Sequence, residues 1–162
     1  MKKTIIENNN WETIWTAIVR DAKTYEIKRI IPFENVVLDQ YKERVAKALS
    51  GDLDETGDTV ADLKGRLYLR YEQLGTSDQT AVSTDTDLIS EDASTLKQIA
   101  SMSQSNNEVN VLSFWDDGEA IGNWREFALY ANNDFAMVRA NIEMDISAGE
   151  TITIHGEINQ SI

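Results

Sequence analysis

The last third of the chain, residues 107–162, constrains the fold more than any other stretch. It holds four runs rich in β-branched, aliphatic and aromatic residues, separated by clusters of Gly, Asn, Asp and Ser. The runs cover residues 108–115, 124–130, 137–146 and 150–158. Runs of this length between such turn residues are typical of consecutive antiparallel strands. In the last two, apolar and polar residues alternate, which predicts one buried and one solvated face.

The preceding part of the chain predicts further strands. Residues 11–19 and 25–31 indicate a hairpin that turns at 21–24, and Pro32 is expected to end or break its ladder because proline cannot donate a backbone hydrogen bond. Residues 66–74 alternate strongly and predict a central strand. Residues 93–102 fit a strand or a one-turn helix. The polar stretch 79–92 predicts a long connection that contributes little to the core.

One short helix is expected at about residues 38–50, within a candidate stretch that begins at Val36. Val45, Ala48 and Leu49 recur at helical spacing, and Asp39 can cap the start of the helix. With about seven strands, this predicts a mainly β fold, namely a single-domain antiparallel β-sandwich over residues 11–162. Residues 1–10 lack a pattern of their own and are expected to form an N-terminal arm that orders on a partner.

Composition limits the partners and the chemistry. The chain of 162 residues has no cysteine, which excludes disulfides and thiolate chemistry. No apolar run reaches the ~18 residues of a membrane span, and no signal peptide is expected. The net charge of −13 repels phosphates and anionic lipid, so neither nucleic acid nor membrane is an expected partner. The acidity provides solubility, or it matches a basic partner surface, an acidic lumen or a saline habitat.

Two acidic segments are candidates for cation binding. Asp52, Asp54 and Asp58 have the spacing of the start of an EF-hand loop, with Gly57 at the sixth position. The twelfth position, which should be a bidentate Glu, is Leu63, and this favours a solvated acidic loop. The second segment, residues 85–92, contains four carboxylates. We expect neither a bound metal nor a cofactor.

The sequence predicts no enzyme and no catalytic residues. His155 is the only histidine and is expected on the polar face of the last strand. A zinc site would need further His or Cys ligands. No serine lies in a nucleophile elbow, and no Gly-rich phosphate loop occurs.

Five residues are candidates for an interface: Trp11, Trp15, Trp115, Trp124 and Arg125. Large aromatic side chains are favoured in cores and at subunit interfaces, and exposed coplanar ones can stack on sugars. Strand alternation puts Arg125 and Glu126 on opposite faces. We expect Arg125 to be the one that orders the site, with a partner in the layer interior or on a neighbouring subunit.

Three segments, in order, resemble a known family. The first is the 21–24 turn followed by 34–37, the second is 71–77 with 83–88, and the third is 122–130 with 137–140 and the closing strand. Together they resemble small tailed-phage virion proteins, related in pattern to the anchoring domains of tail and collar fibres, from about residue 15 to residue 158. Two positions depart from the family pattern: its usual proline is missing at 79–81, and its glycine is Ala128 here.

The resemblance implies a structural protein of the virion, assembled in the host cytoplasm, in the tail, collar or fibre-attachment region. Such a protein acts by assembly with other virion proteins and as a homo-oligomer, without catalytic residues. Two alternatives remain open at this point. One is a carbohydrate-binding β-sandwich module that recognises a host surface, and the other is a decoration protein of the head surface.

Overall fold

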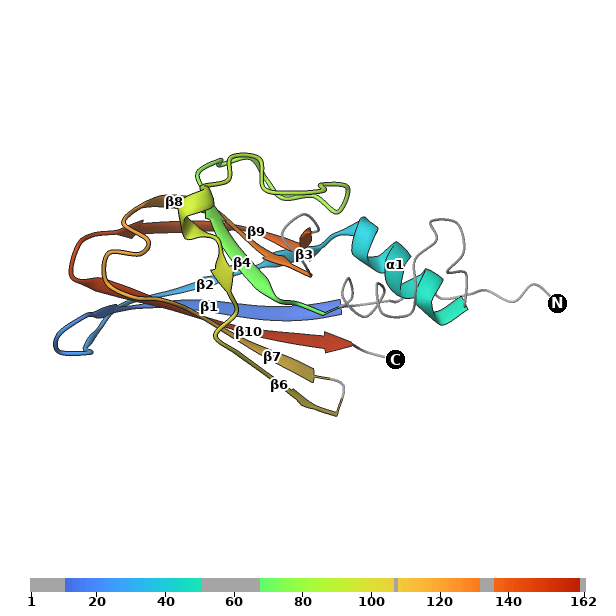
Figure 1. The fold of residues 1–162 in the computed structure, drawn as a ribbon, viewed down its shortest axis with the longest axis horizontal. Coiled ribbons are helices and arrows are strands. Elements are labelled where there is room, and N and C mark those ends of the chain that lie inside the picture. The colour runs from blue at the N-terminus through green and yellow to red at the C-terminus, as the bar shows by residue number, and fades with distance from the viewer. Residues whose placement is uncertain (1–10, 51–67, 107, 132–135, 161–162) are drawn as a thin grey trace.

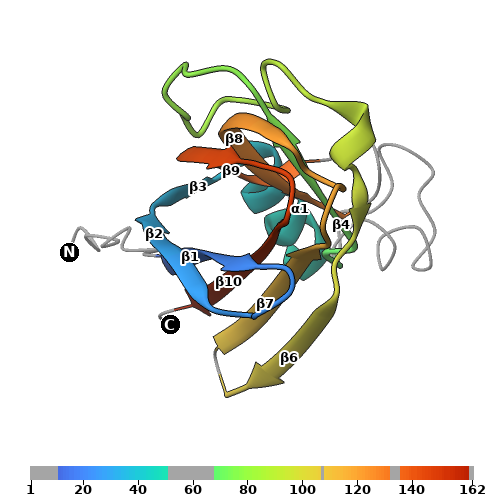
Figure 2. The ribbon, with the colours of Figure 1, turned by 90° about the vertical axis from the view of Figure 1, so that its left-hand side faces the viewer.

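Two antiparallel sheets of five strands form the framework of the computed structural model, which describes residues 11–50, 68–106, 108–131 and 136–160. The two sheets pack face to face, with the single described helix at one end (Figures 1 and 2). The predicted fold class, a mainly β antiparallel sandwich with one short helix, is confirmed.

The chain crosses repeatedly between the two sheets, so strands that are neighbours in sequence often lie in different layers. Sheet A has the order β2 (Ile27–Phe33), β1 (Trp11–Asp21), β10 (Glu150–Gln160), β7 (Glu108–Trp115) and β6 (Ser101–Ser105). Sheet B has the order β3 (Asn35–Val37), β9 (Ala136–Ile146), β8 (Gly122–Tyr130), β4 (Tyr71–Gly75) and β5 (Lys97–Gln98). All four strands predicted in the last third are present, within a few residues of the predicted bounds.

The core lies between the sheets and follows the alternation of the sequence. On β9, Ile142 and Met144 are buried while the intervening Glu143 is exposed; on β10, Ile152 and Ile154 are buried. Burying one such aliphatic side chain stabilises the fold by about 1.5–3 kcal/mol. The alternation of apolar and polar residues therefore orients β9 and β10 with one face toward the core.

Gly156 interrupts the apolar row of β10 because Trp15 occupies the space above it. The two residues are register partners on β10 and β1, and a Cβ atom at position 156 would overlap the indole ring of Trp15. The glycine thus accommodates the largest side chain of the core.

Pro32 lies inside β2, opposite Thr16 of β1, so the prediction that it ends the ladder is wrong. The strand β2 is at the end of sheet A and has a neighbour on only one side. A proline is tolerated on such an edge because a nitrogen that faces outward has no ladder bond to lose.

The helix α1 spans Asp39–Ser50, close to the predicted 38–50, but two details differ. Val36 and Val37 belong to β3, which the sequence analysis did not predict. The carbonyl of Leu38 accepts from the amides of Tyr41 and Lys42, which places Leu38 at the N-cap. The Asp39 carboxylate instead accepts from Lys42 Nζ (3.0 Å) and the Ser83 hydroxyl (2.8 Å), and both contacts lower its pKa.

The middle of the chain is less regular than predicted. The expected strand 66–74 is β4, which begins at Tyr71 and is second from the edge of sheet B; residues 66 and 67 lie outside the described residues. Residues 93–102 contain both alternatives, since a 3₁₀ turn at Ala93–Thr95 precedes β5 and the start of β6. Residues 76–92 form the predicted connection, called the 76–92 connection below. It contributes more to the core than predicted, because Leu88 is buried against Tyr130 and its neighbours. The arm 1–10 lies outside the described residues.

Candidate functional site

Three of the four tryptophans predicted to form an interface lie in the core of the chain. Trp15, Trp115 and Trp124 expose at most 3 % of their surface. Trp15 and Trp115 pack on Phe127 at ring-centroid distances of 5.6 and 6.4 Å. Their indole faces are therefore not available for stacking on a sugar, so these three residues do not support a carbohydrate-binding site. Trp11 is the first residue of β1, and its side chain is not among those that the structure describes.

Arg125 does not order the interior of the site, and Glu126 lies there instead. Arg125 is half-buried at the surface and pairs with Asp145 at 2.9 Å, whereas Glu126 has no exposed surface. The reason is a register shift between β8 and β9 after Trp124. Beyond the shift, Phe127 faces the core between the sheets, while Glu126 faces the opposite side, beneath the 76–92 connection.

The centre of this buried site is Arg139 on β9, whose exposed fraction is 0 %. Its guanidinium donates to Glu126 Oε2 from both Nε (3.0 Å) and Nη2 (2.8 Å), and to Asp85 Oδ2 from Nη1 at 2.6 Å. The carbonyls of Gln79 and Thr80 accept the remaining donors, at 2.8 and 3.4 Å. An arginine has five N–H donors, and all five are used here.

The Glu126 carboxylate is in turn enclosed by backbone amides of the 76–92 connection. Oε1 accepts from the amides of Ser77 (3.0 Å) and Ser90 (2.9 Å), and Oε2 accepts from that of Ile89 (2.8 Å). Gly75 fits beside this group, since a Cβ there would lie 2.9 Å from Glu126 Oε1 and 2.7 Å from the Ser90 carbonyl oxygen. We call Arg139, Glu126 and Asp85 the anchor cluster, because they bind both ends of the connection to sheet B.

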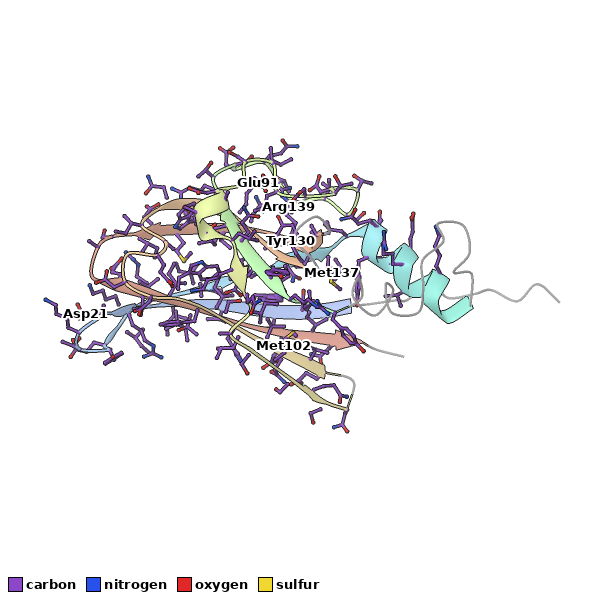
Figure 3. The ribbon with its side chains drawn as sticks, in the orientation of Figure 1. Asp21, Glu91, Met102, Tyr130, Met137 and Arg139 are labelled. Atoms are coloured by element: carbon purple, nitrogen blue, oxygen red, sulfur yellow. The ribbon has the colours of Figure 1, made fainter. Side chains whose placement is uncertain are left out.

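Further hydrogen bonds hold the connection along its length. The Tyr130 hydroxyl donates to Asp87 at 2.5 Å, and burial together with this carboxylate holds the pKa of Tyr130 above its ordinary range. Asn141 bonds the Gln79 carbonyl and the Ala81 amide. Figure 3 shows Arg139 and Tyr130 on the side of sheet B that faces the connection. Buried charges are tolerated when they are paired and hydrogen-bonded, as they are here.

Three acidic residues of the connection bind other groups of the protein. Asp85 is bound to Arg139, Asp87 to Tyr130, and Asp92 to Ser94. Among the described residues, no group of three or more His, Asp or Glu side chains is arranged to hold a metal ion. The first metal candidates, Asp52, Asp54 and Asp58, lie outside the described residues.

His155 lies where the alternation predicted, exposed on the outer face of sheet A. Apolar side chains are exposed on the same face: Ile14 and Ile30 expose 62 % and 60 % of their surface, and Leu112 and Phe114 about a third. Leu112 is the register partner of His155. This face therefore combines exposed aliphatic and aromatic groups with the imidazole ring of His155.

A second buried carboxyl group lies between the two sheets. Glu72 of β4 has no exposed surface, and neither of its oxygens has a hydrogen-bond partner; the buried hydroxyl of Ser113 also has none. Burial raises the pKa of Glu72 to about 8, and the nearby Ser113 hydroxyl, Phe114 amide and Lys97 charge oppose this more weakly. The group is therefore mostly protonated at neutral pH.

The hollows on the described surface include a groove and an apolar pocket. The larger is a groove of about 1060 Å³ where the sandwich is open on one side, lined by residues 31–36, 78, 80, 81, 125 and 141–143. The smaller, of about 360 Å³, is apolar and includes Met102 and Met137, which Figure 3 labels.

Comparisons with family models, with curated proteins and with solved structures found no match to this chain. Within the part of the chain that the structure describes, no helix has the length and apolar character needed to cross a membrane.

The sequence analysis missed the anchor cluster, although its members stand in the segments that carry the family resemblance. Glu126 belongs to 122–130, Arg139 to 137–140 and Asp85 to 83–88. A usable signal was Arg139 itself, a charged residue in the middle of the otherwise apolar run 136–140. Such a residue needs a buried counter-charge.

Proposed function

We propose that this chain is a structural protein of a tailed-phage particle, from the tail, collar or fibre-attachment region, that acts by assembly with other virion proteins. One observation carries the proposal. The segments that resemble the virion family, 71–77, 83–88, 122–130 and 137–140, contribute to one hydrogen-bond network around Arg139. Short motifs that matched by chance would have no reason to meet at one site.

The geometry supports a role in contact more than a role in chemistry. Every member of the anchor cluster is bound to other protein groups, and the result is a long connection fixed on the outside of sheet B. On the opposite side, sheet A exposes Ile14, Ile30, Leu112 and Phe114. Exposed apolar residues that gather on one sheet face mark a surface for protein contacts, and self-association is the simplest use of it.

Quantitative mass spectrometry of purified particles from the source lysate tests this proposal. We expect the chain at a fixed ratio to the major capsid protein. A low ratio places it at the tail axis, and a ratio near that of the capsid protein supports the head-decoration alternative. Absence from the particles, with abundance in the surrounding lysate, would overturn the proposal in both forms.

A further inference from the structure

We propose that the groove at residues 31–36 binds an extended, lysine- or arginine-bearing segment of a partner protein by strand addition to β3. This assigns a site and a partner chemistry that the assembly role alone does not specify. Three features of the groove carry it: its free strand edges, its unprotected main chain and its charge.

Free edges of both sheets meet at this groove. Among the described strands, β2 ends sheet A with only β1 as a neighbour, and β3 ends sheet B with only β9. Residues 31–36 run from the end of β2 into β3 and form one wall of the groove. Figure 2 shows β2 and β3 on the same side of the sandwich. An edge strand presents unpaired N–H and C=O groups, which are a template for another strand.

The two edges differ in how they are protected. β2 carries Lys28 and Pro32, residue types that discourage pairing on an exposed edge. β3 has the sequence Asn35-Val36-Val37, with neither a charge nor a proline. The side-chain amide Nδ2 of Asn35 is moreover buried without a hydrogen-bond partner, while its Oδ1 accepts from Thr13. None of the described strands pairs with the outer edge of β3, so this edge can take a further strand.

The charges that line the groove select the partner. Glu34, Asp78 and Glu143 line it and are exposed. Arg125, the only cation among the described residues of the lining, is neutralised by Asp145 at 2.9 Å. The chain as a whole carries −13, which adds to the attraction. A segment with alternate basic side chains can place its main chain on β3 and direct its charges toward these carboxylates, since side chains of a strand alternate.

A synthetic peptide of alternating lysine and valine, titrated into the ¹⁵N-labelled full chain at low ionic strength, is the probe. We expect saturable NMR shifts of the amides at residues 31 and 33–36. A peptide of alternating glutamate and valine should not bind. A lysine–valine peptide that is N-methylated at alternate residues keeps its charge but lacks strand donors, and it should bind at least about tenfold more weakly.

Two protein variants with the same change in net charge separate the groove from the general field. Glu34→Lys with Glu143→Lys reverses two groove carboxylates and should weaken peptide binding by about an order of magnitude. Glu43→Lys with Glu157→Lys reverses two charges outside the lining and should change it much less. Equal effects of the two variants, shifts confined to another surface, or equal binding of the N-methylated peptide would each overturn the proposal. None of these results depends on the particle measurement.

Discussion

Replacing Glu72 by glutamine should remove a specific pH dependence of stability. The Glu72 carboxyl is enclosed between the two sheets, without a hydrogen-bond partner. Burial raises its pKa from an ordinary 4.5 to about 8 in the folded chain. In the unfolded chain the group ionises near its ordinary pKa, so the unfolded state loses its proton first as the pH rises. Folding stability therefore falls between pH 4.5 and about 8, and this contribution is constant outside that window.

The size of the effect follows from the gap between the two pKa values. Each pH unit within the window costs about 1.4 kcal/mol, which gives a loss of about 5 kcal/mol across it. For a domain of this size, 1 kcal/mol shifts the unfolding midpoint by roughly 2–4 °C. Glutamine has nearly the same shape and carries no charge. The thermal unfolding midpoint of the Glu72→Gln variant should equal that of the parent near pH 4.5 and exceed it by roughly 10–20 °C at pH 8.5.

Thermal unfolding followed by circular dichroism, at constant ionic strength from pH 4.5 to 9, measures this difference. Glu143→Gln is the matched control, because Glu143 is exposed on β9 and its replacement should leave the pH profile nearly unchanged. Taking the difference between parent and variant cancels the titration of other groups. A constant difference between the parent and Glu72→Gln over the whole range would refute the reasoning.

Three further outcomes are expected. Gly156→Ala forces Trp15 aside and should destabilise the chain by about 3 kcal/mol in urea unfolding. In the control variant Gly118→Ala, the added Cβ has no atom within 4 Å and the residue has a φ of +85°, so the loss should be only about 1 kcal/mol. Equal losses in the two variants would contradict the packing argument. Arg139→Met should cost about 3–5 kcal/mol and deprotect the three amides bound to Glu126 together in hydrogen exchange; retained protection would show that the anchor cluster does not hold the connection. Raising salt from about 0.01 to 0.2 M should raise the unfolding midpoint by screening the net charge; an unchanged midpoint would show that self-repulsion is unimportant.

The sequence predicted those parts of the fold that local periodicity determines. The alternation around Ile142 and Ile152 identified β9 and β10, and their bounds differ from prediction by at most two residues. The helix was found because the spacing of its apolar residues is also a local signal. The three-residue strand β3 was missed because it is too short to show a period of its own.

The sequence analysis did not predict the anchor cluster for a different reason. Alternation states which residues share a face, and it does not state what covers that face. The register shift after Trp124 exchanged the expected roles of Arg125 and Glu126, and nothing in residues 124–126 marks it. The connection was expected to contribute little to the core because its side chains are polar. What buries Glu126 is the backbone amides of that connection, which composition does not reveal.

The two buried carboxyl groups of sheet B show how this fold uses burial. Glu126 is compensated by Arg139 and by three backbone amides, so its charge requires the 76–92 connection to stay in one position. If the connection moved away, a buried arginine and a buried glutamate would lose most of their partners at once, and the position is therefore held cooperatively. Glu72 lacks such compensation and costs stability above pH 4.5. A surface loop fixed by a buried ion pair keeps one conformation, and this would suit the assembly by contact proposed above.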